Sequence, residues 1–158
     1  MTDLKILVFS DTHRAIRYME EAVRMENPDQ VIHLGDHMGD AEELSRLFPK
    51  LPVLMVRGNC DYGNIGREEV LTEFRGHRFL LCHGHTYGVK TGLLRYTLAA
   101  REKQVDVALF GHTHRACCEE AHGIWFLNPG SCNGIDPTYG IIHLDENSLC
   151  CEIKNFTD

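Results

Sequence analysis

Residues 5–13 read KILVFSDTH, an apolar run followed by serine, aspartate and histidine. The run over residues 5–9 has the length and composition of a strand buried on both faces of a sheet. A helical stretch is expected over residues 16–26, and a second strand over residues 30–34. Strand, helix and strand in this order predict parallel strands joined by a right-handed crossover.

The rest of the chain extends this pattern and then changes it. A short helix over residues 41–48 and a strand over residues 53–56 complete a βαβαβ unit. Beyond it, strands are expected at 70–74, 78–82, 105–110, 123–127, 139–144 and 149–153, with one helix at 92–103. Gly76-His77 is interpreted as a hairpin turn, and residues 145–148 as another turn. This order predicts two sheets packed face to face with helices outside them, in one domain over residues 1–158.

Composition and the lengths of the apolar runs also indicate in which compartment of the cell the protein is expected. The apolar runs have about strand length, well below the roughly 20 residues of a membrane-spanning helix. The first residues lack the basic and apolar segments of a signal peptide. Seven cysteines, an odd number, are most simply interpreted as reduced thiols in the cytoplasm.

Five of the expected strands end at side chains that can bind a metal ion. In open α/β sheets ligands bind beyond the carboxyl ends of strands, so the five loops can meet at one place. Glycine beside four of the five groups permits tight turns and close backbone approach. The candidate residues are Asp11 and His13, Asp36, Asn59, His83 and His85, and His112 and His114.

Each of these groups alone also has an ordinary structural explanation. Asp-x-His after a strand can be a helix cap beside a solvated histidine, and Gly-Asp and Gly-Asn are common turn sequences. The two pairs of alternating histidines are harder to explain as core residues. Five such groups in one order rarely arise from turn preferences, so metal binding is favoured. Mixed carboxylate, imidazole and amide ligands suit manganese, iron, zinc or nickel better than calcium.

The ordered motifs resemble those of the calcineurin-like metallophosphoesterases. These motifs are Asp-x-His, Gly-Asp, Gly-Asn-x-Asp, His-Gly-His and Gly-His-Thr-His, followed by Asn128-Pro129-Gly130-Ser131. The resemblance spans residue 6 to about residue 131, and the short chain with Gly-Asn-Cys-Asp is most similar to the small bacterial and archaeal phosphodiesterase branch. It implies an α/β (α+β) fold, a four-layer αββα sandwich of two mixed sheets flanked by helices.

The resemblance also implies two divalent metal ions, expected to be Mn²⁺, with Ni²⁺, Zn²⁺ or Fe²⁺ as alternatives. Asp11, His13 and His114 would bind the first ion, Asn59, His83 and His112 the second, and Asp36 both. Asp36, Asn59, His83 and His112 would be the catalytic residues. The implied reaction is in-line attack on phosphorus by a hydroxide that bridges the two ions.

Three further residues are expected to contact the substrate: Arg14, Cys60 and His85. Cys60 stands where many family members have the histidine that is assigned as the acid for the leaving group. A thiol with a pKa of about 8.5 is a poor substitute for that acid. His37, which follows Asp36, can also point at the site, whereas His33 is expected as a core residue or as a residue that supports the metal ligands.

The expected function is therefore hydrolysis of phosphate esters, with a phosphodiester as the preferred substrate. A phosphomonoesterase with the same site and a non-catalytic scaffold, like the retromer-associated member of the superfamily, remain the alternatives. The net charge of -7, without a run of lysine or arginine, argues against nucleic-acid polymers and anionic membranes as partners. The expected partner is a small phosphate ester, and exposed strands leave a homodimer open.

Overall fold

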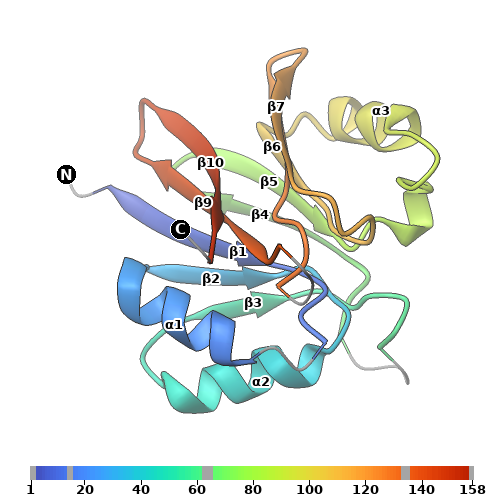
Figure 1. Cartoon of the computed structure of the whole chain (residues 1–158). Coiled ribbons are helices and arrows are strands. Elements are labelled where there is room, and N and C mark those ends of the chain that lie inside the picture. The colour runs from blue at the N-terminus through green and yellow to red at the C-terminus, as the bar shows by residue number, and fades with distance from the viewer. Residues whose placement is uncertain (1–2, 14–15, 62–65, 133–135, 157–158) are drawn as a thin grey trace.

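The computed structural model describes residues 3–13, 16–61, 66–132 and 136–156, and it contains two five-stranded sheets (Figure 1). In sheet order, the first sheet consists of β10 (Leu149–Asn155), β9 (Thr138–Leu144), β1 (Leu4–Phe9), β2 (Gln30–His33) and β3 (Val53–Met55). The second consists of β4 (Glu69–Phe74), β5 (His77–Cys82), β6 (Val107–Leu109), β8 (Ile124–Asn128) and β7 (Cys117–Ala121).

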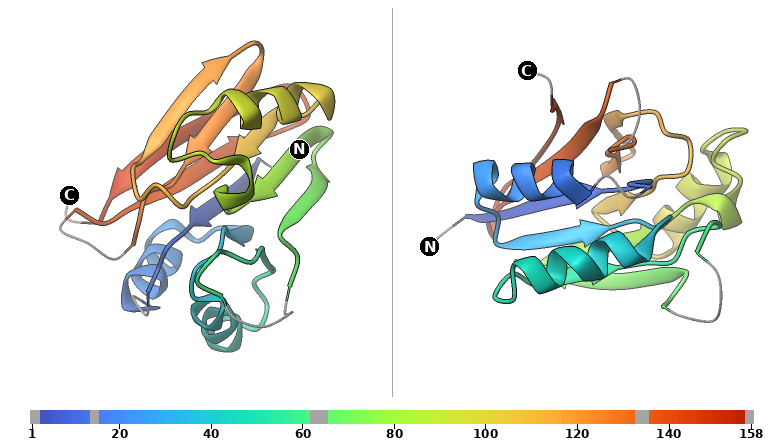
Figure 2. Two further views of the ribbon diagram at one scale, coloured as in Figure 1. Left: turned by 90° about the vertical axis from the view of Figure 1, so that its right-hand side faces the viewer. Right: turned by 60° about the horizontal axis from the view of Figure 1, so that its bottom comes forward.

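In the first sheet three parallel strands extend to one edge and the antiparallel pairings lie on the other side, whereas the second sheet has parallel strands at its centre and an antiparallel strand at each edge. β1, β2 and β3 run parallel, and so do β5, β6 and β8. The helices are α1 (Ile16–Glu26), α2 (Met38–Leu47) and α3 (Leu94–Glu102), with a 3₁₀ turn over His85–Tyr87. α1 and α2 cover the outer face of the first sheet, and α3 covers that of the second (Figures 1 and 2). The predicted sandwich of two mixed sheets flanked by helices is confirmed.

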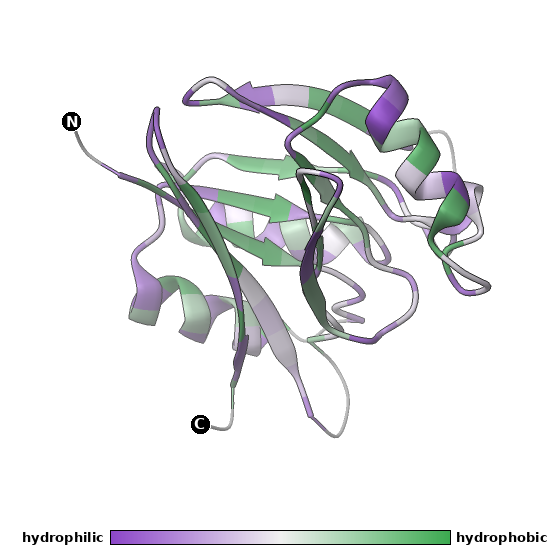
Figure 3. Cartoon of the chain, turned by 90° about the horizontal axis from the view of Figure 1, so that it is seen from above, coloured by the Kyte–Doolittle hydropathy of each residue, from purple (hydrophilic) through white to green (hydrophobic). Residues whose placement is uncertain are grey.

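The alternation of side chains along the central strands produces these layers. In β1, Ile6 and Val8 face the second sheet, and Leu7 and Phe9 pack under α1 and α2. β5 divides in the same way between the core shared by the sheets and the layer under α3. Both faces of these strands are therefore apolar, and the hydrophobic residues along the central strands appear green in Figure 3. Burial of each such side chain contributes about 1.5–3 kcal/mol.

Three local predictions differ from the structure. The strand β7 was not predicted, because its sequence CCEEA lies at a sheet edge and has no clear apolar alternation. α2 begins at Met38 rather than at residue 41, and the side chain of its N-cap residue, His37, makes no capping hydrogen bond. The β4–β5 turn is formed by Arg75 and Gly76, both with positive φ, so His77 is already in the strand. None of the helices in the described part of the chain is long and apolar enough to cross a membrane.

Candidate metal centre

The loops that follow β1, β2, β3, β5 and β6 meet at one edge of the sandwich. Backbone hydrogen bonds join them: the Asp11 N–H donates to the Gly35 carbonyl (3.0 Å), and the Gly111 N–H donates to the His83 carbonyl (2.8 Å). The His112 N–H donates to Asp11 Oδ2 (3.0 Å), which links a loop of the second sheet to one of the first. The predicted convergence of the strand ends is therefore present.

Close packing of these loops requires glycine at two positions. A Cβ atom at Gly58 would collide with Asp36, and one at Gly111 would collide with Ser10. At Gly58 the atoms in the way include the backbone nitrogen of Asp36, so only a residue without a side chain lets these two loops approach this closely.

The backbone at this edge is conformationally strained. Of the ten described non-glycine residues with positive φ, six belong to these loops. They are Asp11, His13, Asp36, His37, His112 and His114. Positive φ is unfavourable for residues with a side chain, and such strain concentrates at functional sites.

Four of the predicted ligands form one compact group. Asp11, His13, Asp36 and His114 each offer a ligand atom, and these atoms lie within 4.8 Å of one another. Asp11 and Asp36 are buried, whereas the side chain of His114 is 47% exposed. His114 Nε2 lies 3.1 Å from Asp11 Oδ1. The group therefore combines two buried carboxylates with imidazoles that are open to solvent.

His83 and His112 extend this group toward the second sheet. His83 Nε2 lies 3.5 Å from Asp36 Oδ2, 3.7 Å from Asp11 Oδ1 and 3.2 Å from His112 Nδ1. On the other side of its ring, His83 Nδ1 lies 2.9 Å from the Leu34 carbonyl. That carbonyl can only accept, so Nδ1 carries the hydrogen, and Nε2 is left to face the carboxylates.

The side chains gathered here fit divalent cations. Asp11 Oδ2 accepts hydrogen bonds from the Ser10 hydroxyl and the His112 N–H, but Asp11 Oδ1 is buried and accepts none. An unsatisfied buried carboxylate oxygen is costly unless a cation or donor compensates it. The convergence of imidazole nitrogens on this oxygen is therefore best explained by a bound metal ion.

The pKa shifts of Asp36 and His112 agree with this assignment. Burial raises the pKa of Asp36, but hydrogen bonding to His83 and its charge outweigh burial and hold that pKa well below its usual range. Burial and the charge of His83 lower the pKa of His112 to about 4. An ionised carboxylate and a neutral imidazole are the forms that bind metals.

The loop after β3 carries Asn59 and Cys60. The Cys60 N–H donates to Asp36 Oδ1 (2.8 Å), which brings this loop beside Asp36. Asn59 is exposed. The short distances described above connect the other six predicted ligands and do not include Asn59. Burial and the negative charge of Asp36 raise the pKa of the Cys60 thiol, so the thiol stays protonated at neutral pH.

The candidate residues outside the predicted ligand set differ in how they lie relative to the metal centre. The ring of His85 lies 5.6 Å from that of His83 and 6.1 Å from that of His112, and its Nδ1 is buried without a hydrogen-bond partner. His37 packs edge-on against His13, with ring centroids 4.9 Å apart. His33 is fully buried, as predicted. Arg14 lies outside the described residues.

Two residues that hold the loops were not assigned this role from the sequence. Asp61 accepts three backbone hydrogen bonds, from Asp36 (2.9 Å), Met38 (2.8 Å) and Gly58 (2.8 Å). In the sequence it is only the last residue of the Gly-Asn-Cys-Asp motif, but its carboxylate joins the loops after β2 and β3. Asn128, noted only as part of a turn, donates to the Gly111 carbonyl (3.2 Å) and to Thr113 Oγ1 (2.9 Å). It thus braces the segment that carries His112 and His114.

We expect Asp61→Ala to destabilise the fold and to disturb the site. Three backbone donors lose a charged acceptor, and each hydrogen bond to a charged group contributes about 1.5–3 kcal/mol. Water can replace part of this loss, so the free energy of unfolding should fall by about 3 kcal/mol. Urea titration measures this change. Asp145→Ala is the control, since Asp145 also accepts backbone hydrogen bonds but lies in an exposed turn between β9 and β10. An unchanged urea midpoint for Asp61→Ala would show that the clamp does not stabilise these loops.

Comparison with known proteins agrees with the geometry. Residues 4–147 match the calcineurin-like phosphoesterase superfamily domain. The chain is 34% identical over 131 residues to the probable metallophosphoesterase YsnB of Bacillus subtilis, covering 81% of this chain and 75% of that protein. It is 27% identical over 165 residues to the phosphodiesterase MJ0936 of Methanocaldococcus jannaschii, covering 90% and 95% of the two chains.

A solved structure shows the same architecture. A predicted phosphoesterase from Streptococcus pneumoniae superposes with a TM-score of 0.81 at 25% identity, over 99% of this chain and 92% of that one. The family match spans most of the chain and includes every strand end described above. The chain belongs to the calcineurin-like phosphoesterase superfamily.

Proposed function

We propose that this protein is a metal-dependent phosphodiesterase with a binuclear metal centre. Its family and its relatives make it a hydrolase of phosphoric ester bonds. One observation carries the finer proposal. Two buried carboxylates and four imidazoles from strand ends of both sheets converge, and one buried carboxylate oxygen among them accepts no hydrogen bond.

The ligands divide into two sets. Asp11, His13 and His114 would hold one divalent ion, Asn59, His83 and His112 a second, and Asp36 both. The compact group of Asp11, His13, Asp36 and His114 supports the first set, and the short distances from His83 to Asp36 and His112 support the second. The assignment of Asn59 as a ligand rests on the position of its loop, since the N–H of the next residue, Cys60, donates to Asp36. We propose Mn²⁺ as the native metal, because mixed oxygen and nitrogen ligands suit it.

Divalent ions bound here supply Lewis acidity, lower the pKa of water and stabilise negative charge on phosphoryl oxygens. The protein's part is to fix the ligands before the substrate arrives. The Leu34 carbonyl orients His83, Asp61 holds the Asp36 loop, and Asn128 braces the His112 loop. Because these groups are already in position, no free energy is needed to order them when the transition state forms.

Cys60 is not a strong acid that could protonate the leaving group. The raised pKa of Cys60 keeps the thiol protonated but makes it a weak proton donor. Esters whose alcohols leave easily, such as aryl esters, should therefore react faster than alkyl esters. His85, with an unpartnered Nδ1 beside His83, is the other side chain we propose to contact the substrate.

A phosphomonoesterase with the same centre is the second candidate, and a comparison of two aryl esters separates the two. We expect kcat/KM for bis(p-nitrophenyl) phosphate to exceed that for p-nitrophenyl phosphate by about tenfold or more, since a factor of ten requires only about 1.4 kcal/mol of selective binding. A preference for the monoester would favour the phosphomonoesterase. If neither ester is hydrolysed with Mn²⁺, Ni²⁺, Zn²⁺ or Fe²⁺, the scaffold alternative is correct.

The cellular setting is part of the same proposal. All seven cysteines are free, which suits a reducing cytoplasm. A homodimer stays a prediction, which analytical ultracentrifugation can test.

A further inference from the structure

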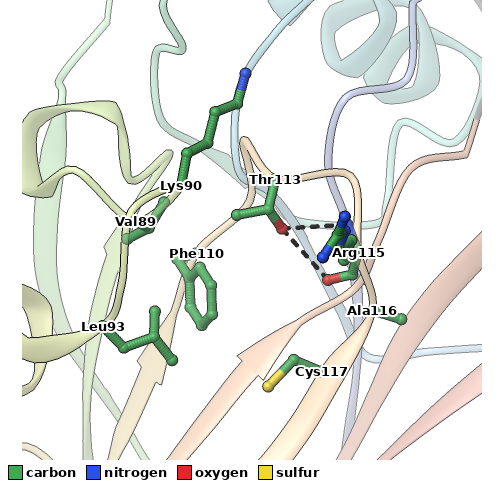
Figure 4. A pocket seen from close by; sticks show the side chains of 8 residues that line it. All are labelled: Val89, Lys90, Leu93, Phe110, Thr113, Arg115, Ala116 and Cys117. Atoms are coloured by element: carbon green, nitrogen blue, oxygen red, sulfur yellow. Dashed lines mark hydrogen bonds between the residues drawn. The ribbon is translucent and has the colours of Figure 1, made fainter.

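A pocket of about 440 Å³ lies beside the metal centre, between the segment that precedes α3, the end of β6 and the residues that lead into β7 (Figure 4). Small-molecule sites commonly measure about 300–1,000 Å³, so this pocket can hold one organic group of moderate size. The reaction at the metals involves only phosphorus and its oxygens, and does not use this space.

The pocket adjoins the metal centre directly. Thr113, one of its lining residues, stands between His112 and His114 in the chain and is held by Asn128. A substrate with its phosphorus at the metals can therefore extend one ester group into this pocket.

The lining combines an apolar wall with two cations. Leu93 is the partly exposed member of this wall, Val89 and Phe110 lie nearly buried behind it (5% and 2% exposed), and Figure 4 shows the three side chains gathered on one side. Neighbouring aromatic packing holds the Phe110 ring in place, since Tyr96 meets it edge-on with centroids 5.6 Å apart. Such a wall suits a flat ring.

Lys90 and Arg115 give the pocket a local positive charge. Both are exposed, and the ion pairs found in the described part of the chain involve neither of them. The described lining residues include no carboxylate. In a protein of net charge -7, two cations without a carboxylate partner at one pocket select a second negative charge on the substrate.

We infer that this pocket binds one alcohol portion of the phosphodiester and selects an alcohol that carries both a flat ring and a second phosphate. A nucleotide has this chemistry: its base would lie against Leu93, in front of the buried Phe110, and its terminal phosphate would meet Lys90 and Arg115. This inference rests on the proposed phosphodiesterase function and names its substrate class.

The kinetic test compares two substrates that differ in one phosphate. We expect wild-type enzyme with Mn²⁺ to hydrolyse 5′-phosphorylated dithymidine monophosphate with a kcat/KM at least about tenfold above that for the unphosphorylated dinucleotide, as one charged contact commonly provides. Lys90→Ala and Arg115→Ala should raise KM for the phosphorylated substrate about tenfold, with kcat nearly unchanged, because the contact is equal in ground and transition states. Neither change should alter hydrolysis of bis(p-nitrophenyl) phosphate.

Arg101→Ala is the matched control, since Arg101 is an exposed cation on α3 that does not line the pocket. If the terminal phosphate makes no difference to wild-type kinetics, or if Arg101→Ala has the same effect as the two pocket variants, the inference is wrong while the hydrolase function stands.

A second measurement does not depend on turnover. Cys117 lines the pocket, whereas Cys150 is exposed elsewhere. In the full-length chain with a chelator present, thymidine 5′-monophosphate should slow alkylation of Cys117 by N-ethylmaleimide, and thymidine should protect it less. Alkylation of Cys150 should not change, and peptide mass spectrometry resolves the two sites. Protection of Cys117 without hydrolysis of any ester would refute the proposed function but keep the binding site. Absence of protection would refute the binding site itself.

Discussion

His112→Ala should lower turnover of a phosphodiester by about 10³-fold or more, because each 1.36 kcal/mol of lost transition-state stabilisation is a factor of ten and a metal ligand contributes several kcal/mol. The imidazole of His112 faces His83 across 3.2 Å, so its loss opens the second ligand set. Asp36→Ala should have an effect at least as large, since Asp36 is the proposed ligand of both ions. Steady-state kinetics at saturating Mn²⁺ measures the loss.

The fold should survive the His112 substitution. His112 lies in a loop at a half-buried position with φ of 71°, and alanine there costs about 1 kcal/mol of backbone strain. His122→Ala is the matched control, because His122 has φ of 55° in an exposed turn outside the site. Equal stability of the two variants with activity lost only in His112→Ala would locate the effect in the chemistry. Near-normal turnover of fully metal-loaded His112→Ala would contradict the assignment.

Removal of metal should abolish activity and also lower thermal stability. Without a cation, Asp11 Oδ1 stays buried and unsatisfied beside the carboxylate of Asp36. A ligand at 100 times its Kd stabilises the native state by about 2.7 kcal/mol. For a protein of this size each kcal/mol shifts Tm by about 2–4 °C, so saturating Mn²⁺ should raise Tm by roughly 5–10 °C.

Differential scanning fluorimetry with and without Mn²⁺ measures this shift, and Asp36→Ala should respond much less. Readdition of Mn²⁺ to the stripped enzyme should restore activity, and parallel additions of Ni²⁺, Zn²⁺ and Fe²⁺ rank the metals. A stripped protein with unchanged activity and unchanged Tm would exclude a metal centre of this kind.

The sequence predicted the parts of the site that depend on residue type and order. Apolar runs placed the central strands, and the polar residues after them indicated which side chains would meet. Convergence of strand ends is a property of parallel sheets, so Asp11, Asp36 and His112 could be brought together without knowledge of any contact.

The sequence could not predict the parts that depend on tertiary contacts. Asp61 resembles a turn aspartate until the backbone amides of Asp36, Met38 and Gly58 are seen to point at it. The edge strand β7 is defined by its pairing with β8 rather than by its own composition. The pocket has the same origin, because Lys90 and Arg115 line one pocket only when the loops of the second sheet pack together.

The most direct test of the account is anomalous X-ray diffraction from crystals grown with Mn²⁺. Two manganese peaks are expected per chain, one bounded by Asp11, His13 and His114, the other by Asn59, His83 and His112, with Asp36 in contact with both. Peaks at other positions, or ions that leave Asp36 uncoordinated, would contradict the proposed centre.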